Sequence, residues 1–343
     1  MAHTSRSAGS RPGTDETAGG LVESPLQLLC AVEAFAAGLV GPRLRLRVRS
    51  DVPSLGTALA QLDRLGLPDG IEPELVPGRA GLTAREPLQL TGDANSGIVQ
   101  AWTLTHGFRR LVVVDDGLDT LELARVLTTP GQAVVRLRGS DGRVRRLLGR
   151  AVGHRLRRAA RAGRVTIFTA MPLPADHRRA LADLGVDLRT NIFSWLRSLP
   201  APEAPPEPVV LVGSALVADG LVHPGLYVDW VRELAALGPV RYLPHRRQRG
   251  DVLAVLADVP GVVVDAPGAP VELRLRGLVA GQCVTMLPST TAVLLTRILS
   301  PRGVRVRPRG VPANWWTPAA GPQLRTHLDQ VVDLAERVRR ADG

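Results

Sequence analysis

The chain has 343 residues, 45% of them hydrophobic and 22% charged, a length typical of two α/β domains with their own apolar cores. Its 43 basic residues outnumber 32 acidic ones, the formal net charge is +11, and every basic residue is arginine. The missing lysine excludes a Schiff-base lysine and a P-loop lysine. Because arginine stays protonated, we expect arginines to bind anions while other side chains transfer protons.

The number and spacing of cysteines and histidines indicate the redox environment of the protein and whether it binds a metal. The two cysteines, Cys30 and Cys283, form neither a disulfide framework nor a CxxC site, which suits a reducing cytoplasm. The seven histidines show no metal-binding spacing. Residues 1–18 are polar and read as a disordered tail, and no apolar run is long enough to span a membrane. We therefore expect a cytoplasmic protein.

Short apolar runs alternate with helical patterns through the first half of the chain. Ser24 is a suitable N-cap for the first helix, with Pro25 at its first position. The pattern predicts strands at 20–22, 44–48, 71–76, 110–114 and 164–168, and helices at 25–38, 55–65 and 94–106.

The segment LPAPEAPPEP, residues 199–208, is too rich in proline for a helix or a central strand and predicts an interdomain linker. The alternation then restarts. It predicts strands at 209–212, 240–243, 262–264 and 282–286, helical segments at 224–237, 252–256, 271–279 and 291–299, and a closing amphipathic helix at 324–340.

Alternation on both sides of a linker predicts an α/β protein with two Rossmann-like, doubly wound domains facing a cleft and a C-terminal helix. The predicted domains are 19–198 and 209–315, followed by a closing segment, 316–343. This is the outline of a GT-B glycosyltransferase, but a periplasmic binding protein or an epimerase shares it, so the outline alone does not decide function.

Polar clusters follow several predicted strands, where such folds bind ligands. Asp115 and Asp116 come directly after the buried run RLVVV, and repulsion between adjacent carboxylates can raise one pKa enough for a general base. A helix cap and a turn are the alternative. Asp93 and Asn95 precede another helix, where an acceptor contact is weighed against capping.

The second half carries residues suited to a phosphate. His245 and Arg246 follow one predicted strand, and Ser289 and Thr290 lie between a strand and a helix, whose free N–H groups favour an anion. Ser24 stands at a similar position in the first half. A solvated basic turn and ordinary N-capping are the alternative interpretations.

Taken together, these motifs resemble the bacterial GT-B sialyltransferases, in particular the lipooligosaccharide sialyltransferase and capsule polysialyltransferase group. The resemblance rests on VVDDG, YLPHRRQ, PSTTAVL and the opening VESPLQLLCAVEA, spread over residues 20–300. PVEL, around Glu272, is similar to the segment whose acidic residue reaches the nucleotide ribose. Arg246 stands where that group has proline after the histidine.

The resemblance implies inverting transfer of sialic acid, or a related acidic sugar, from a CMP-activated donor to a cell-surface or capsular glycan, with no metal or other cofactor. Asp115 would deprotonate the acceptor, with Asp116 as second choice, and His245 would assist departure of CMP. The implied donor-binding residues are Ser24, Gly213, Arg246, Glu272, Ser289 and Thr290.

Residues 136–164 contain eleven arginines against a single acid, Asp141, so this segment supplies +10 of the net charge. Leucine and valine interleave with the arginines in an amphipathic helical pattern. Such a helix suits an anionic membrane surface or a polyanionic acceptor, and a solvated face without a partner is the alternative. Nucleic acid is not expected, because no nucleic-acid-binding module accompanies the charge and only 3% of residues are aromatic.

Two other functions remain open from the sequence. One is a GT-B transferase or epimerase that uses a UDP- or GDP-sugar. The other is a degenerate, non-catalytic transferase that binds a membrane or another polyanion.

Overall fold

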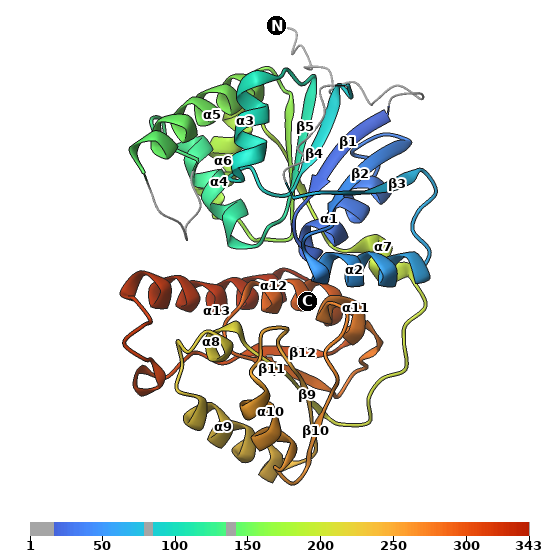
Figure 1. The fold of residues 1–343 in the computed structure, drawn as a ribbon, viewed down its shortest axis with the longest axis vertical. Helices are drawn as coiled ribbons and strands as arrows, with labels where there is room; N and C mark the ends of the chain where they lie inside the picture. The colour runs from blue at the N-terminus through green and yellow to red at the C-terminus, as the bar shows by residue number, and fades with distance from the viewer. Residues whose placement is uncertain (1–16, 79–84, 135–141, 343) are drawn as a thin grey trace, which may run out of the picture. The chain divides into compact units, whose positions relative to one another are not determined.

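The computed structural model describes residues 17–78, 85–134 and 142–342. The chain forms two units: unit 1 ends at Trp195 and unit 2 begins at Leu196. Each unit is built on one parallel sheet with helices on both faces, and unit 2 ends in a long helix (Figure 1). The expected α/β class with two Rossmann-like, doubly wound domains is therefore confirmed.

Unit 1 contains a sheet of seven parallel strands in the order β3-β2-β1-β4-β5-β6-β7. The strand bounds are β1 Thr17–Val22, β2 Arg43–Arg49, β3 Ile71–Val76, β4 Leu88–Thr91, β5 Arg110–Val114, β6 Val165–Thr169 and β7 Asp187–Thr190. The run RLVVV predicted β5 with its observed bounds, whereas β4 and β7 were not predicted. Both are four-residue strands whose place in the sheet comes from their neighbours.

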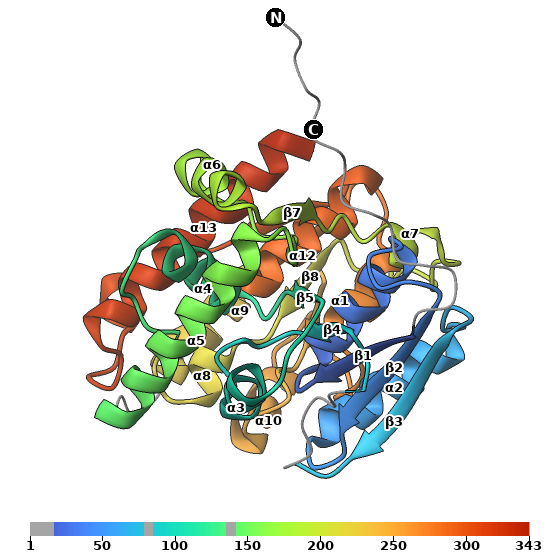
Figure 2. The ribbon, with the colours of Figure 1, turned by 90° about the horizontal axis from the view of Figure 1, so that it is seen from above.

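Two groups of helices cover the sheet of unit 1. Helices α1 and α2 pack together on one face, whereas α3, α4, α5 and α6 pack against one another on the other; Figure 2 shows α3 beside α5. The helix bounds are α1 Pro25–Ala36, α2 Pro53–Arg64, α3 Gly97–Thr105, α4 Leu118–Thr128, α5 Arg143–Arg161, α6 Ala175–Leu184 and α7 Ser194–Ser198. Of the predicted amphipathic segment 136–164, residues 136–141 lie outside the described part of the chain.

The predicted disordered tail, 1–18, is wrong at its end, because β1 begins at Thr17 rather than at Gly20. Ala18 is fully buried and pairs with Leu44 of β2 and Leu88 of β4. The run TAGG carries no apolar pattern of its own. Its small residues are needed where neighbouring leucines pack closely, since a Cβ on Gly20 would lie 2.9 Å from Leu46 Cδ1.

Unit 2 repeats the design with five parallel strands in the order β10-β9-β8-β11-β12. Their bounds are β8 Val209–Val212, β9 Val240–Leu243, β10 Val262–Val264, β11 Cys283–Met286 and β12 Arg305–Pro308. The predicted bounds of β8, β9 and β10 match the structure. Strand β12 was missed because arginines alternate with its only buried apolar residue, Val306.

The helices of unit 2 also form two groups, in which α9 packs on α10 while α12 packs on α11 and α13. The bounds are α8 Ala215–Ala218, α9 Pro224–Leu237, α10 Gly250–Ala257, α11 Val271–Arg274, α12 Thr290–Leu299 and α13 Pro322–Asp342, with 3-10 turns at Leu275–Gly277, Ser300–Arg302 and Ala313–Trp315. The predicted helix 271–279 is thus a short α-helix followed by a 3-10 turn.

The proline-rich segment 199–208 lies within unit 2. Arg276 donates a hydrogen bond to the Pro200 carbonyl, and Gln282 donates to the carbonyls of Pro205 and Glu207. The carbonyls of this segment therefore accept hydrogen bonds from side chains of the same unit.

In the part of the chain that the structure describes, no helix combines the length and the apolar character needed to cross a bilayer.

Candidate functional site

Each sheet has one point at which the strand order reverses, between β1 and β4 in unit 1 and between β8 and β11 in unit 2. In open parallel sheets, ligands bind beyond the carboxyl ends of the strands at such a point. Glu23 and Ser24 follow β1, and Asp93 follows β4. The carboxyl pair Asp115 and Asp116 follows the next strand, β5. The reversal in unit 1 is therefore surrounded by carboxylates.

Asp115 is fully buried, and both of its carboxylate oxygens accept hydrogen bonds from the turn after β6. Thr169 Oγ1 donates to Oδ1, and the Ala170 amide donates to Oδ2. Burial raises the pKa of Asp115 to about 6, although these bonds and one from Thr120 oppose the rise. Asp115 therefore ties the end of β5 to the end of β6 and has no exposed surface for a substrate.

Asp116 is only partly buried and lies beside the first helix of the chain. Its Oδ1 accepts a hydrogen bond of 3.2 Å from Ser24 Oγ. Burial raises the pKa of Asp116 to about 6 and repulsion from Asp93 adds to the rise, while hydrogen bonds from Gln27 and Ser24 oppose it. A carboxylate with this pKa is ionised at neutral pH and still basic enough to accept a proton.

Ser24 and Gln27 hold this site together through the start of α1. Ser24 Oγ accepts a hydrogen bond from the Gln27 amide as the helix N-cap, and Gln27 Oε1 accepts one from the Glu23 amide. Gly92, after β4, permits this arrangement, because a Cβ there would lie 2.1 Å from Gln27 Cγ. Ser24 thus caps the helix and donates a hydrogen bond to Asp116. The capping interpretation is confirmed, and the contact with a donor phosphate stays a prediction.

Asp93 joins the carboxyl pair through tertiary structure. It is buried after β4, and its Oδ1 accepts a hydrogen bond of 2.7 Å from the Asn95 amide. Asp93 was predicted from the sequence as either an acceptor contact or a helix cap. Because β4 was not predicted, the electrostatic interaction of Asp93 with Asp116 was not predicted either. Thr169 was not predicted as a site residue. Gln27 was noted only as part of the polar stretch ESPLQ after the first strand.

Two predicted site residues, Gly213 and His245, meet at the corresponding edge of unit 2. Gly213 follows β8 and its amide donates to the Leu243 carbonyl of β9. A Cβ on Gly213 would lie 2.6 Å from the His245 amide nitrogen and 2.8 Å from Tyr242 Oη. Only glycine therefore lets the loop after β8 lie against His245.

His245 is half-buried among cationic groups. Its Nδ1 accepts a hydrogen bond of 3.3 Å from the Arg247 amide. Burial lowers the pKa of His245 to about 4, and the charges of Arg247 and Arg246 lower it further against a weaker effect of Asp219. In the free protein this imidazole is neutral at physiological pH. The exposed guanidinium of Arg247 pairs with Asp219 at 2.8 Å.

Ser289 and Thr290 occupy the beginning of α12, directly after β11. Ser289 has the extended backbone of an N-cap, but its hydroxyl donates to Met286 Sδ instead of bonding a helix amide. Both side chains are partly exposed. This helix start lies on the other side of the strand-order reversal from Gly213, which places the predicted phosphate-binding residues at one edge of one sheet.

Glu272 lies on α11, which follows the edge strand β10 rather than a strand next to the reversal. It is buried, and burial raises the pKa of its carboxyl, which accepts a hydrogen bond from its own amide. Helix α11 packs on α12, so Glu272 belongs to the same face of the sheet as Ser289 and Thr290.

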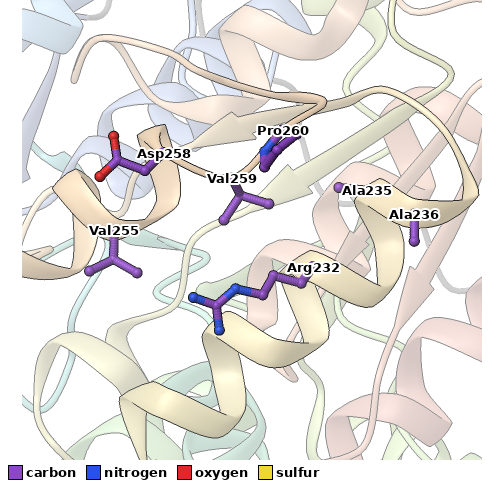
Figure 3. Close-up of a pocket in the computed structure, with 7 residues that line it drawn as sticks. All are labelled: Arg232, Ala235, Ala236, Val255, Asp258, Val259 and Pro260. Atoms are coloured by element: carbon purple, nitrogen blue, oxygen red, sulfur yellow. The ribbon is translucent and has the colours of Figure 1, made fainter.

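One cavity of unit 2 lies away from these residues. It has a volume of about 520 Å³ and lies between the C-terminal ends of α9 and α10. Figure 3 shows Arg232, Val255 and Val259 among the residues that line it. Since β9 and β10 begin after those helices, this cavity is at the amino edge of the sheet, opposite Gly213 and His245. Among the described residues, no group of three or more His, Cys, Asp or Glu side chains is placed to hold a metal ion.

No protein-family model matches the chain, and no curated protein matches it in sequence. Solved structures similar to it include LpCGTa with UDP (12% identity, TM-score 0.44, 95% of this chain and 94% of that one). Others are a UDP-glucose: anthocyanidin 3-O-glucosyltransferase with UDP (12%, 0.47, 96% of each) and Phytolacca americana UGT2 with UDP-2fluoro-glucose and pterostilbene (10%, 0.44, 96% of each). These similarities are distant, and the fold is established by the chain's own two sheets.

Proposed function

We propose that the chain is an inverting glycosyltransferase that moves sialic acid, or a related acidic sugar, from a CMP-activated donor to a cell-surface or capsular glycan. The observation that carries the proposal is the environment of the Asp116 carboxylate. Asp116 is a partly exposed carboxylate with a pKa raised to about 6, beside the strand-order reversal of unit 1. Residues suited to a phosphate surround the strand-order reversal of unit 2. A two-domain transferase needs a general base for the acceptor in one domain and a binding site for the nucleotide in the other.

Asp116 is the general base of the proposed reaction. Its carboxylate takes the proton of an acceptor hydroxyl, the hydroxyl oxygen bonds to the anomeric carbon, and the bond from that carbon to the CMP phosphate breaks. The electron pair leaves with CMP. Asp115, the first choice from sequence, is less suited because it has no exposed surface and both of its oxygens are engaged. We propose that Asp115 positions Asp116.

The donor phosphate is proposed to bind in unit 2, between His245 and the beginning of α12. A neutral imidazole donates one ring hydrogen to a phosphate oxygen, and the negative charge of a bound phosphate favours protonation of the ring. Free amide groups at the start of α12 favour the same anion. Arg246 is exposed beside His245 and supplies a further positive charge.

The proposed ribose contact, Glu272, requires its buried carboxyl to become accessible when the donor binds. CMP as the leaving nucleotide rests on the motif set, above all VVDDG and PSTTAVL, and a UDP- or GDP-sugar is the alternative that the experiment must separate.

The test is a thermal-shift comparison of CMP, UDP and GDP and their sugar conjugates, followed by measurement of CMP release from CMP-sialic acid with candidate acceptors. A ligand that binds the native state raises its melting temperature. We expect CMP-sialic acid to stabilise the protein, with Asp116→Asn retaining that shift but losing transfer, and Asp183→Asn, an exposed carboxylate of α6, retaining both. A shift with UDP or GDP compounds only, or transfer that survives both Asp116→Asn and His245→Ala, refutes the proposal.

A further inference from the structure

Helix α5 has two apolar faces, and only one of them is covered. Val152, Leu156 and Ala160 are buried against the core of unit 1. Val144, Leu147 and Leu148 form a neighbouring apolar face nearer the start of the helix and are 71%, 62% and 45% exposed. Their spacing continues to the exposed Ala151, so positions i, i+3, i+4 and i+7 form one stripe. A contiguous exposed apolar stripe is a typical sign of an interaction surface.

Arginines border this stripe. Arg143, Arg145 and Arg150 are exposed on the same helix, and the sequence of α5 contains no acidic residue. A helix of this kind, apolar on one side and basic along its flanks, is suited to the interface of an anionic bilayer.

The stripe leads into a basic cavity. Ala151 lines a hollow of about 470 Å³ whose other lining residues include His154, Arg158 and Arg164, and among the residues that the structure describes this lining contains no acid. Arg155, also in the lining, donates to the carbonyls of Leu104 and His106, and Arg164 donates to that of Phe108.

These bonds hold two guanidinium groups at the wall of the cavity. The buried Arg164 Nε has no hydrogen-bond partner there. A small anionic group such as a phosphate would meet fixed positive charge without competing carboxylates.

We propose that the Val144–Ala151 stripe and the adjoining cavity dock the protein on an anionic phospholipid bilayer. The apolar side chains enter the boundary between head groups and acyl chains, and the arginines bind lipid phosphates. A nucleic acid would satisfy the arginines but would leave the apolar stripe in water, so the bilayer accounts for both features. The docking is independent of the proposed sugar transfer, because none of these residues belongs to the proposed catalytic set.

The test uses the full chain and co-sedimentation with vesicles of phosphatidylcholine alone or mixed with phosphatidylglycerol. We expect binding to the mixed vesicles only, weakened by salt because it is electrostatic in part. Arg143→Gln with Arg145→Gln should weaken binding at least tenfold, since each basic residue lost costs roughly fivefold in affinity. Leu147→Glu with Leu148→Glu should also weaken binding at least tenfold, because it replaces two apolar side chains that enter the bilayer by charged ones.

Two matched controls keep the result specific. Leu237→Glu replaces an isolated leucine of α9 that is 88% exposed, and Arg178→Gln with Arg179→Gln removes two exposed charges from α6. Both should bind mixed vesicles as the unmodified chain does, with all variants keeping its melting temperature.

Three outcomes would overturn the proposal. The first is absence of binding to mixed vesicles. The second is undiminished binding by the double leucine variant, which would leave a surface for soluble polyanions such as duplex DNA. The third is equal loss in the control variants, which would show that net charge or folding, not α5, decides the binding.

Discussion

Asp116→Asn is expected to abolish sugar transfer and at the same time to stabilise the protein at neutral pH. Burial and the charge of Asp93 raise the pKa of Asp116 from 3.8 to about 6, so the folded structure disfavours the ionised carboxylate. At about 1.4 kcal/mol per pKa unit, the free-energy penalty for ionised Asp116 above pH 6 is at most about 3 kcal/mol. An amide of the same shape carries no such penalty.

The sign of the pH dependence follows from proton uptake. Between pH 3.8 and about 6 the folded protein holds a proton on Asp116 that the unfolded chain has lost. The contribution of this group to stability is therefore complete below pH 3.8 and is lost as the pH rises through about 6. The stabilisation by Asp116→Asn should accordingly be large at about pH 7.5 and small at about pH 4.

Urea denaturation monitored by circular dichroism at both pH values measures this difference. The dependence of the unfolding free energy on urea concentration should be the same for both proteins. The control Asp183→Asn, on the exposed side of α6, should change stability by less than about 0.5 kcal/mol at either pH. Asp115→Asn should stabilise less than Asp116→Asn, because an amide nitrogen would then face a hydrogen-bond donor, Thr169 or Ala170. Equal effects of Asp116→Asn at the two pH values would refute the reasoning.

Three further predictions concern the same two edges. The pH profile of kcat/KM should rise through about pH 6 with ionisation of Asp116 and show no step from His245 between about pH 5 and 8, since the pKa of that ring is lowered to about 4. Ser24→Ala should move the rise to higher pH, because the Ser24 hydroxyl lowers the pKa of Asp116; its lost N-cap should cost about 1 kcal/mol in urea denaturation. Gly213→Ala should destabilise unit 2 by about 1–3 kcal/mol, because its Cβ would meet the backbone of His245; an unchanged urea midpoint would contradict this.

Local sequence patterns were sufficient to predict those strands and helices whose type and bounds depend on adjacent residues. The run RLVVV predicted β5 with its observed bounds, and VVLV did the same for β8. Such runs are apolar on both faces because parallel strands are buried on both faces. Helix α9 was equally clear, since Pro224 begins it and Gly238 follows it.

Strands without such a pattern could not be predicted from the sequence. Strand β4, LQLT, is buried throughout, yet it is four residues long and half polar. Its identity comes from pairing with β1 and β5 on either side. This omission mattered for function, because β4 carries Asp93 to the carboxyl pair.

The sequence by itself determined the class of fold, the strand ends that carry acidic, histidine and hydroxyl side chains, and the concentration of positive charge in one segment. Only the tertiary structure decided which member of the pair Asp115 and Asp116 is accessible, and which face of α5 remains uncovered. The physical reason is that burial, pKa and exposure depend on neighbours that are distant in the chain. Adjacent carboxylates look equivalent in sequence until Thr169 binds one of them and Ser24 the other.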